Sequence, residues 1–303
     1  MPEASDSEKR DIGAVLKRIR ALEIKVRHLV DESFAGSYNS VFKGQGMNFE
    51  EVREYQPGDE IRSIDWNVTA RLSEPYVKLF TEERELSLVL LVDLSASGNY
   101  GSQEFSKREI AAEVAATLAF SAIGNSDRVA LIIFADDVEL FVPPGKGRSH
   151  VLRIIREVLY YQPKTKGTNI SNALSFLNRV VRHRSIAFLI SDFYAPGYEK
   201  ELAQARRRHD VSAIQIRDPL EESLPNVGRI MMEDQETAEL IEINTSSASV
   251  RREFEQRVQQ RQDNIEQDFA KLGVDHIAIT TTDNYLPAMR GFFRQRERRQ
   301  SRR

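Results

Sequence analysis

Hydroxyl and carboxylate side chains follow two apolar stretches that lie far apart in the sequence. Leu88–Val92 runs into Asp93-Leu94-Ser95-Ala96-Ser97, and Ile186–Ser191 is followed by Asp192. Between them, Gly167-Thr168-Asn169 opens a predicted helix. In an open α/β sheet, ligands bind beyond the carboxyl ends of the strands, where neighbouring connections leave toward opposite faces. If the strands before Asp93 and Asp192 are neighbours there, the side chains that meet are those of Asp93, Ser95, Ser97, Thr168 and Asp192.

Two carboxylates and three hydroxyls form a hard, all-oxygen ligand set that suits Mg²⁺, Mn²⁺ or Ca²⁺ better than zinc. If Ser95, Ser97 and Thr168 bind the ion directly and the carboxylates act mainly through water, the ion keeps most of its positive charge. An open position then accepts an Asp or Glu from another protein. At an effective dielectric constant of about 20, opposite unit charges 4 Å apart attract by about 4 kcal/mol before desolvation. The alternative is a cluster of helix caps and turn residues without an ion.

The elements that must position these side chains alternate between strands and helices after residue 83. Apolar strands between helices predict a doubly wound, mostly parallel α/β sheet. A β-hairpin over residues 228–243, turning near 234–237, is predicted as an insertion. The predicted strands cover residues 86–93, 129–134, 138–142, 186–191, 211–216 and 274–280, and the predicted helices cover residues 108–123, 151–160, 170–181, 199–208, 254–272 and 285–298.

The regions before and after this alternation differ from it in character. Residues 1–33 predict an amphipathic helix that packs on the body of the protein, with docking to a partner or to an anionic membrane as alternatives. Residues 34–84 predict turns and short strands. A main domain is expected over residues 85–293, with its insertion near 220–247. Residues 294–303 form a basic tail after it, which is expected to be a frayed helix end. We expect five charged side chains to clamp the 34–84 segment onto that domain: Arg53, Glu54, Asp59, Arg62 and Asp65.

Composition excludes several classes of protein. The chain has 303 residues, 41% of them hydrophobic, and a formal net charge of −3, which does not favour a nucleic-acid or membrane-surface partner. It has no cysteine, which excludes disulfide scaffolds, thiolate nucleophiles and cysteine-ligated metal sites. No apolar run reaches the roughly 18 residues of a membrane helix, and no signal-peptide core is present. We therefore expect a cytoplasmic protein.

The three parts of the oxygen motif, taken in order, resemble the metal-ion-dependent adhesion site of von Willebrand factor A domains. Further motifs resemble the signature that precedes the A domain in one bacterial family, catalogued as domain of unknown function number fifty-eight and often encoded beside MoxR-type AAA+ ATPases. These motifs are Lys43-Gly44-Gln45-Gly46, Val52-Arg53-Glu54-Tyr55, Pro57-Gly58-Asp59, Arg62-Ser63-Ile64-Asp65-Trp66, Thr69-Ala70-Arg71, Val77-Lys78-Leu79-Phe80, Asp218-Pro219 and Leu224-Pro225.

The resemblance implies a fold of von Willebrand factor A type and a metal held by Asp93, Ser95, Ser97, Thr168 and Asp192. It also implies a non-enzymatic adaptor that works with a MoxR-type ATPase in the maturation or remodelling of client proteins. One departure is Gly98, where many relatives carry Met, but it changes no ligand oxygen. Some related proteins carry membrane helices, which this sequence lacks.

Two other functions remain as alternatives. One is a metal-dependent hydrolase in the same pocket. A phosphatase of the haloacid dehalogenase type is disfavoured because Ser95 stands where its second carboxylate would be needed. The other is nucleic-acid binding through the arginine-rich residues 206–208 and the tail, although arginines at helix ends also simply complement the helix dipole.

Overall fold

The computed structural model describes residues 6–33, 46–72, 74–83, 86–99, 105–233 and 240–300. The chain divides into two compact units. One comprises residues 42–86, and the other comprises residues 1–41 together with 87–303. The larger unit contains the oxygen motif, so its sheet decides whether the candidate ligands meet.

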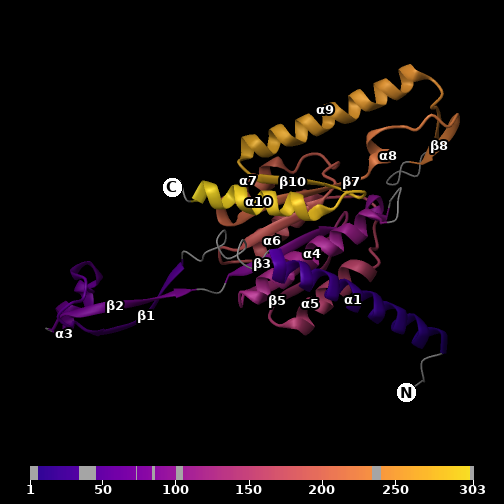
Figure 1. Cartoon of the computed structure of the whole chain (residues 1–303). Helices are drawn as coiled ribbons and strands as arrows, with labels where there is room; N and C mark the ends of the chain where they lie inside the picture. The colour runs from indigo at the N-terminus through magenta and orange to yellow at the C-terminus, as the bar shows by residue number, and fades with distance from the viewer. Residues whose placement is uncertain are drawn as a thin grey trace. The chain divides into compact units, whose positions relative to one another are not determined.

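A six-stranded sheet forms the centre of the larger unit (Figure 1). Its order is β10-β7-β6-β3-β4-β5, and β5 alone pairs antiparallel to its neighbour. The first strand of the sheet, β3, therefore lies in the centre, and the chain adds strands first on one side and then on the other. The strands are β3 (Ser87–Asp93), β4 (Arg128–Phe134), β5 (Val138–Gly145), β6 (Ile186–Ser191), β7 (Asp210–Arg217) and β10 (Asp275–Thr280).

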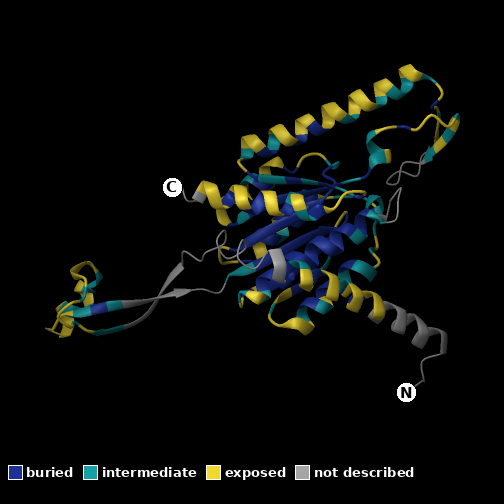
Figure 2. Cartoon of the chain, viewed as in Figure 1, coloured by how far each residue is buried: buried dark blue, intermediate teal, exposed yellow. Residues whose placement is uncertain are grey.

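Helices cover both faces of this sheet because the central strands are apolar on both sides. Residues 88–92 of β3 and all of β6 are buried (Figure 2). On one face, α6 (Ile170–Val180), α7 (Glu199–Arg208) and α9 (Ala248–Leu272) enclose a continuous core with the strands. On the other face lie α4 (Lys107–Gly124), α5 (Arg148–Tyr160) and α10 (Tyr285–Gln300), where α10 meets α4 through Tyr285 and Thr117. The predicted doubly wound, mostly parallel α/β fold is confirmed.

The N-terminal helix α1 (Asp6–Ser33) packs on α4. Val26 is fully buried in this contact. Lys25 Nζ lies 2.8 Å from a carboxylate oxygen of Glu113 on α4. Buried Glu23 accepts hydrogen bonds from Arg148 on α5, which lowers the pKa of Glu23. Among the described side chains of this helix, Ile19, Val26 and Val30 therefore face the body of its own unit.

The smaller unit is an antiparallel ribbon with a short helix. Its strands β1 (Gly46–Glu54) and β2 (Tyr76–Glu83) flank η1 (Ile61–Ser63) and α3 (Trp66–Leu72). Arg53 binds Asp59 through two bonds of 2.9 and 2.7 Å, and Asp65 pairs with Lys78 at 3.3 Å. Arg62 and Glu54 are exposed. The expected ion pairs thus form in part, and the clamping of this segment onto the other unit stays a prediction.

The chain between β7 and α9 forms the inserted hairpin. After β7 come α8 (Pro219–Glu222), β8 (Arg229–Glu233) and β9 (Leu240–Asn244), and the two strands pair antiparallel. The predicted turn near 234–237 lies outside the described residues. This insertion leaves the sheet at the carboxyl end of β7, which is the edge where the oxygen motif is expected.

The basic C-terminal residues differ from their predicted state. The helix α10 continues through Gln300, where a frayed tail from Arg294 was expected. Arg296 is buried and donates hydrogen bonds to Ser212 Oγ at 2.8 Å and to Asp210 at 2.6 Å. Arg299 pairs with Asp275. Arg296 and Arg299 therefore fix this helix to the amino ends of β7 and β10, and buried Arg296 finds there the acidic partner that a buried charge needs.

Buried His209 makes the stability of the larger unit sensitive to acid. Neither ring nitrogen of His209 has a hydrogen-bond partner, and the residue is 1% exposed. Burial, with Arg208 and Arg184 nearby, lowers the pKa of His209 to about 4. The unfolded chain binds this proton more tightly than the folded chain, so stability falls as the pH drops from about 6.5 toward 4.

We expect His209→Gln to reduce the loss of unfolding free energy between pH 7 and pH 5 by about 1–2 kcal/mol relative to the native sequence. Urea titrations at both pH values measure this difference. The variant His183→Gln, which removes an exposed imidazole, serves as the control. If the free energy of unfolding depends on pH equally in His209→Gln and in the native chain, the acid sensitivity does not come from His209.

Candidate metal centre

Asp93 and Asp192 lie at the carboxyl ends of two adjacent parallel strands. Asp93 ends β3, and Asp192 follows β6 directly, with Val92 of β3 paired to Ile190 of β6. The chain leaves β3 for α4 on one face and leaves β6 for α7 on the other. This is the switch point at which α/β sheets bind ligands.

The Asp93 carboxylate is buried and held on both oxygens by the chain itself. The backbone N–H of Ser95 donates to Oδ1 at 2.9 Å, and the hydroxyl of Ser191 donates to Oδ2 at 2.6 Å. Burial, and then the charge of Asp192, raise the pKa of Asp93 to about 6. The carboxylate is therefore fixed in direction and lies in an electrostatic surrounding that favours an added positive charge.

The hydroxyls of Ser95 and Ser97 lie side by side. They occupy the loop after β3 that begins η2 (Ala96–Asn99), and the two Oγ atoms are 3.1 Å apart. Mg²⁺ binds its six oxygens at about 2.0–2.1 Å in an octahedron, so neighbouring ligands of one ion are about 3 Å apart. The spacing of these two hydroxyls suits adjacent positions on one ion.

Thr168 lies in the loop that borders the two serines. The backbone N–H of Ala96 donates to the carbonyl of Lys166 at 2.9 Å, which joins the two loops. Gly167 lies against Asp136, whose carboxylate accepts a hydrogen bond from the Gly167 N–H at 3.2 Å, so a side chain at this position would have to displace that carboxylate. Within the described chain, no hydrogen bond joins Thr168 to the other four candidates. The loop that carries Thr168 is therefore joined to the loop of the two serines, and direct binding of an ion by Thr168 stays a prediction.

A lysine that the sequence analysis passed over occupies the same edge. Lys107, at the start of α4, places Nζ 2.9 Å from Asp192 Oδ2 and 2.6 Å from Glu221 Oε1 on α8. Its side chain is only 4% exposed. Burial opposes its charge, but Asp192 and Glu221 raise the pKa of the ammonium above its usual range. Glu221 Oε2 is buried without a hydrogen-bond partner.

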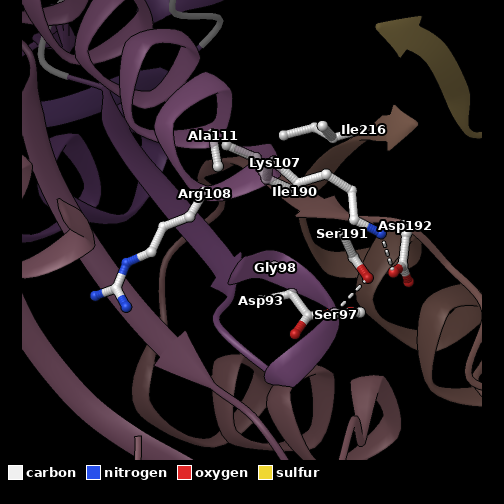
Figure 3. Close-up of a pocket in the computed structure, with 10 residues that line it drawn as sticks. All are labelled: Asp93, Ser97, Gly98, Lys107, Arg108, Ala111, Ile190, Ser191, Asp192 and Ile216. Atoms are coloured by element: carbon white, nitrogen blue, oxygen red, sulfur yellow. Dashed lines mark hydrogen bonds and ion pairs between the residues drawn. The ribbon is translucent and has the colours of Figure 1, made fainter. Parts of the chain in front are cut away.

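A small pocket opens at this edge, lined among others by Asp93, Ser97, Lys107 and Asp192, and the charges around it fit a divalent cation. Three carboxylates and one ammonium leave a formal charge of −2 when all four are ionised, namely those of Asp93, Asp192, Glu221 and Lys107. Arg108 also lines the pocket, but its guanidinium points away and binds the carbonyls of Val158 and Tyr161 (Figure 3). One divalent ion would neutralise this edge. In the described ranges, this edge included, no group of three or more His, Asp or Glu side chains is placed to hold a metal, so an ion here would depend on the hydroxyls as well.

Ser191, Lys107 and Glu221 were missed because their roles arise only when distant elements meet. One signal was available for Lys107. It is the first residue of α4, after Ser106, which forms a capping box with Glu109. A cation at a helix N-terminus is opposed by the helix dipole, so a buried one there needs acidic partners.

Comparisons with known proteins agree with the family that the sequence resembles. The model of the family described as "Protein of unknown function DUF58" matches residues 51–264. The uncharacterized protein Rv1480 of Mycobacterium tuberculosis is 30% identical over 283 residues, which cover 92% of this chain and 89% of that protein. No helix in the described part of the chain is long and apolar enough to cross a membrane.

Solved structures with some likeness to the chain include BatB from Bacteroides thetaiotaomicron. It is 17% identical, with a TM-score of 0.46, over 70% of this chain and 99% of that one. The manganese-loaded TRAP protein of Plasmodium vivax is 19% identical, with a TM-score of 0.27, over 44% of this chain and 57% of that one.

Proposed function

The chain belongs to the family of proteins of unknown function DUF58, and from this premise we propose that it is a metal-dependent protein-interaction module. A divalent ion, with Mg²⁺ as the first candidate, would be held by Ser95, Ser97 and Thr168, with Asp93 and Asp192 supporting it. The bound ion supplies a positive charge with a free coordination position, which attracts an acidic side chain of a partner protein.

The observation that carries this proposal is the meeting of two neutral hydroxyls with an edge that keeps a net negative charge in spite of Lys107. Ser95 and Ser97 offer uncharged oxygens at a spacing that suits two ligands of one ion. Both oxygens of the Asp93 carboxylate already accept hydrogen bonds from the chain, so this carboxylate supports the ion without being its direct ligand. Neutral ligands leave the ion more electrophilic than direct carboxylate ligands would, so a carboxylate from outside can complete the shell.

We further propose that the module is not an enzyme. Ser95 and Ser97 hydrogen-bond to each other, and no histidine is among the residues that line the pocket in Figure 3. A hydroxyl nucleophile needs a neighbouring base, and the arrangement offers these two serines none besides the carboxylates that support the ion. The ATPase partner follows from the sequence resemblance: a MoxR-type AAA+ ATPase, acting with this chain on client proteins.

The proposal is tested by co-precipitation of the purified MoxR-type ATPase from the same organism, in Mg²⁺ and in EDTA. We expect capture in Mg²⁺, and loss of capture both in EDTA and with the variant Ser95→Ala/Ser97→Ala. The chain offers a matched control: Ser247 and Ser249 are also two residues apart, with their hydroxyls 2.8 Å from each other on the surface. Capture that survives EDTA and Ser95→Ala/Ser97→Ala would remove the ion from the mechanism.

A further inference from the structure

A buried residue next to Asp192 has a backbone conformation that side chains other than glycine rarely adopt. Among the described residues that are not glycine, two have a positive φ, Ser126 at 65° and Phe193 at 61°. Ser126 lies just after the end of α4, where chains commonly enter this left-handed region. Phe193 is 2% exposed and directly follows Asp192. A left-handed phenylalanine is strained by the approach of its Cβ to the backbone, so the surrounding structure must hold it there.

The turn at Phe193 directs two successive N–H groups back to the candidate metal centre. The Phe193 N–H donates to Ser191 Oγ at 3.1 Å, and the Tyr194 N–H donates to Asp192 Oδ1 at 3.1 Å. Because the Ser191 oxygen accepts from Phe193, its own hydrogen points elsewhere, to Asp93 Oδ2 at 2.6 Å. Both carboxylates of the centre therefore depend on this turn for the direction of one hydrogen bond.

The helix α9 holds Phe193 in this turn through its ring. The ring centroids of Phe193 and Phe269 are 5.0 Å apart in an edge-to-face arrangement, and Phe269 is fully buried. The ring of Tyr198 lies 5.9 Å from that of Phe193. All three rings belong to the core on this face of the sheet. Aromatic pairs in this geometry attract each other beyond the area that they bury, so ring packing offsets the strain of the backbone.

The same helix also holds the peptide bond between Asp192 and Phe193. Gln215 Nε2 of β7 donates to the carbonyl of Asp192 at 3.0 Å and to Gln262 Oε1 of α9 at 2.9 Å. Both glutamines are buried. Gln262 and Phe269 are seven residues apart on α9, so they lie on one face of it. One face of α9 thus fixes both the carbonyl that precedes Phe193 and the ring of Phe193.

We propose that Phe193 is a positioning residue of the candidate metal centre, and that its packing on α9 sets how firmly the ion is held. The inference rests on the proposed function and adds what controls the affinity of that same site. With the ring in place, the turn keeps Asp93 and Asp192 in fixed directions. Without the ring, the backbone relaxes out of the left-handed region and the two N–H groups leave their acceptors. An ion then has to realign the carboxylates, which weakens its binding.

The matched variants Phe193→Ala and Phe193→Gly test this inference in the full chain. Both remove the ring from the core, but only alanine keeps the Cβ that makes the left-handed region unfavourable. We expect Phe193→Ala to bind Mn²⁺ about tenfold more weakly than Phe193→Gly, as measured by electron paramagnetic resonance. Loss of core packing alone would weaken binding by the two variants equally.

A second readout needs no metal. In EDTA, the protection of the Tyr194 N–H from hydrogen exchange is expected to be about tenfold lower in Phe193→Ala than in Phe193→Gly. The reason is that alanine leaves the turn that places this N–H on Asp192. Nuclear magnetic resonance measures the protection of this single amide.

The contact with α9 is tested by Phe269→Leu, which is expected to weaken Mn²⁺ binding several-fold. Its control is Phe292→Leu, which removes a ring contact with Phe188 at 6.0 Å on the other face of the sheet and keeps full affinity. Equal Mn²⁺ affinity within either pair of variants would overturn the positioning role and leave the proposed function standing. A native chain that binds no Mn²⁺, with protection still lower in Phe193→Ala, would instead overturn the proposed function.

Discussion

Lys107→Met is expected to lower the free energy of unfolding by about 3–5 kcal/mol in EDTA, because it leaves the buried carboxylate of Asp192 and the partly buried carboxylate of Glu221 without their cation. Asp192 and Glu221 lie 2.9 and 2.6 Å from the ammonium, and Lys107 itself is almost fully buried. In a unit of this size the loss corresponds to a fall in Tm of roughly 10 °C. Differential scanning calorimetry measures it.

Mg²⁺ should recover part of this loss. Removing the ammonium changes the formal charge of the edge from −2 to −3, so the ion stabilises Lys107→Met more than it stabilises the native chain. The control is Lys271→Met, which removes an exposed lysine 3.2 Å from Asp268 and is expected to cost less than about 1 kcal/mol. Equal losses for the two variants would contradict the structural role of Lys107.

The second large effect is the loss of metal-induced stabilisation in Ser95→Ala/Ser97→Ala. A ligand at 100 times its Kd stabilises the folded state by about 2.7 kcal/mol. For the native chain this corresponds to a rise in Tm of roughly 5–10 °C on addition of Mg²⁺. The double variant lacks the two neutral oxygens that lie 3.1 Å apart, so its Tm is expected to stay unchanged.

The matched control for this experiment is Ser247→Ala/Ser249→Ala, which removes an equivalent hydroxyl pair at the start of α9. It should keep the full rise in Tm. A rise of the same size in Ser95→Ala/Ser97→Ala would show that the ion binds elsewhere, and the assignment of the metal centre would fail.

The sheet could be predicted from the sequence because its strands are short apolar runs between helical patterns. The strand Ile186–Ser191 and the helix Glu199–Arg208 have the bounds predicted for them. The proximity of Asp93 and Asp192 was predicted on the condition that their two strands are neighbours, and the strand order of the sheet meets that condition. The bounds of an element follow from its own hydrophobic periodicity, and the end of a strand that carries a given residue follows from the direction of that strand.

Contacts between distant elements could not be predicted from the sequence. The bridge from Asp192 through Lys107 to Glu221 joins residues separated by 85 and 114 positions, and no local pattern specifies it. The burial of Arg296 near the end of α10 was missed for the same reason. A run of arginines favours a solvated tail, but Arg296 is buried by its pairing with Asp210 at the far end of β7.

The most direct test of the account is a titration of the purified chain with Mn²⁺, followed by electron paramagnetic resonance. The account predicts one bound ion per chain that Mg²⁺ displaces, that Ser95→Ala/Ser97→Ala fails to bind, and whose spectrum changes when an acidic peptide is added. An ion that binds equally well to Ser95→Ala/Ser97→Ala, or no bound ion at millimolar Mn²⁺, would contradict it.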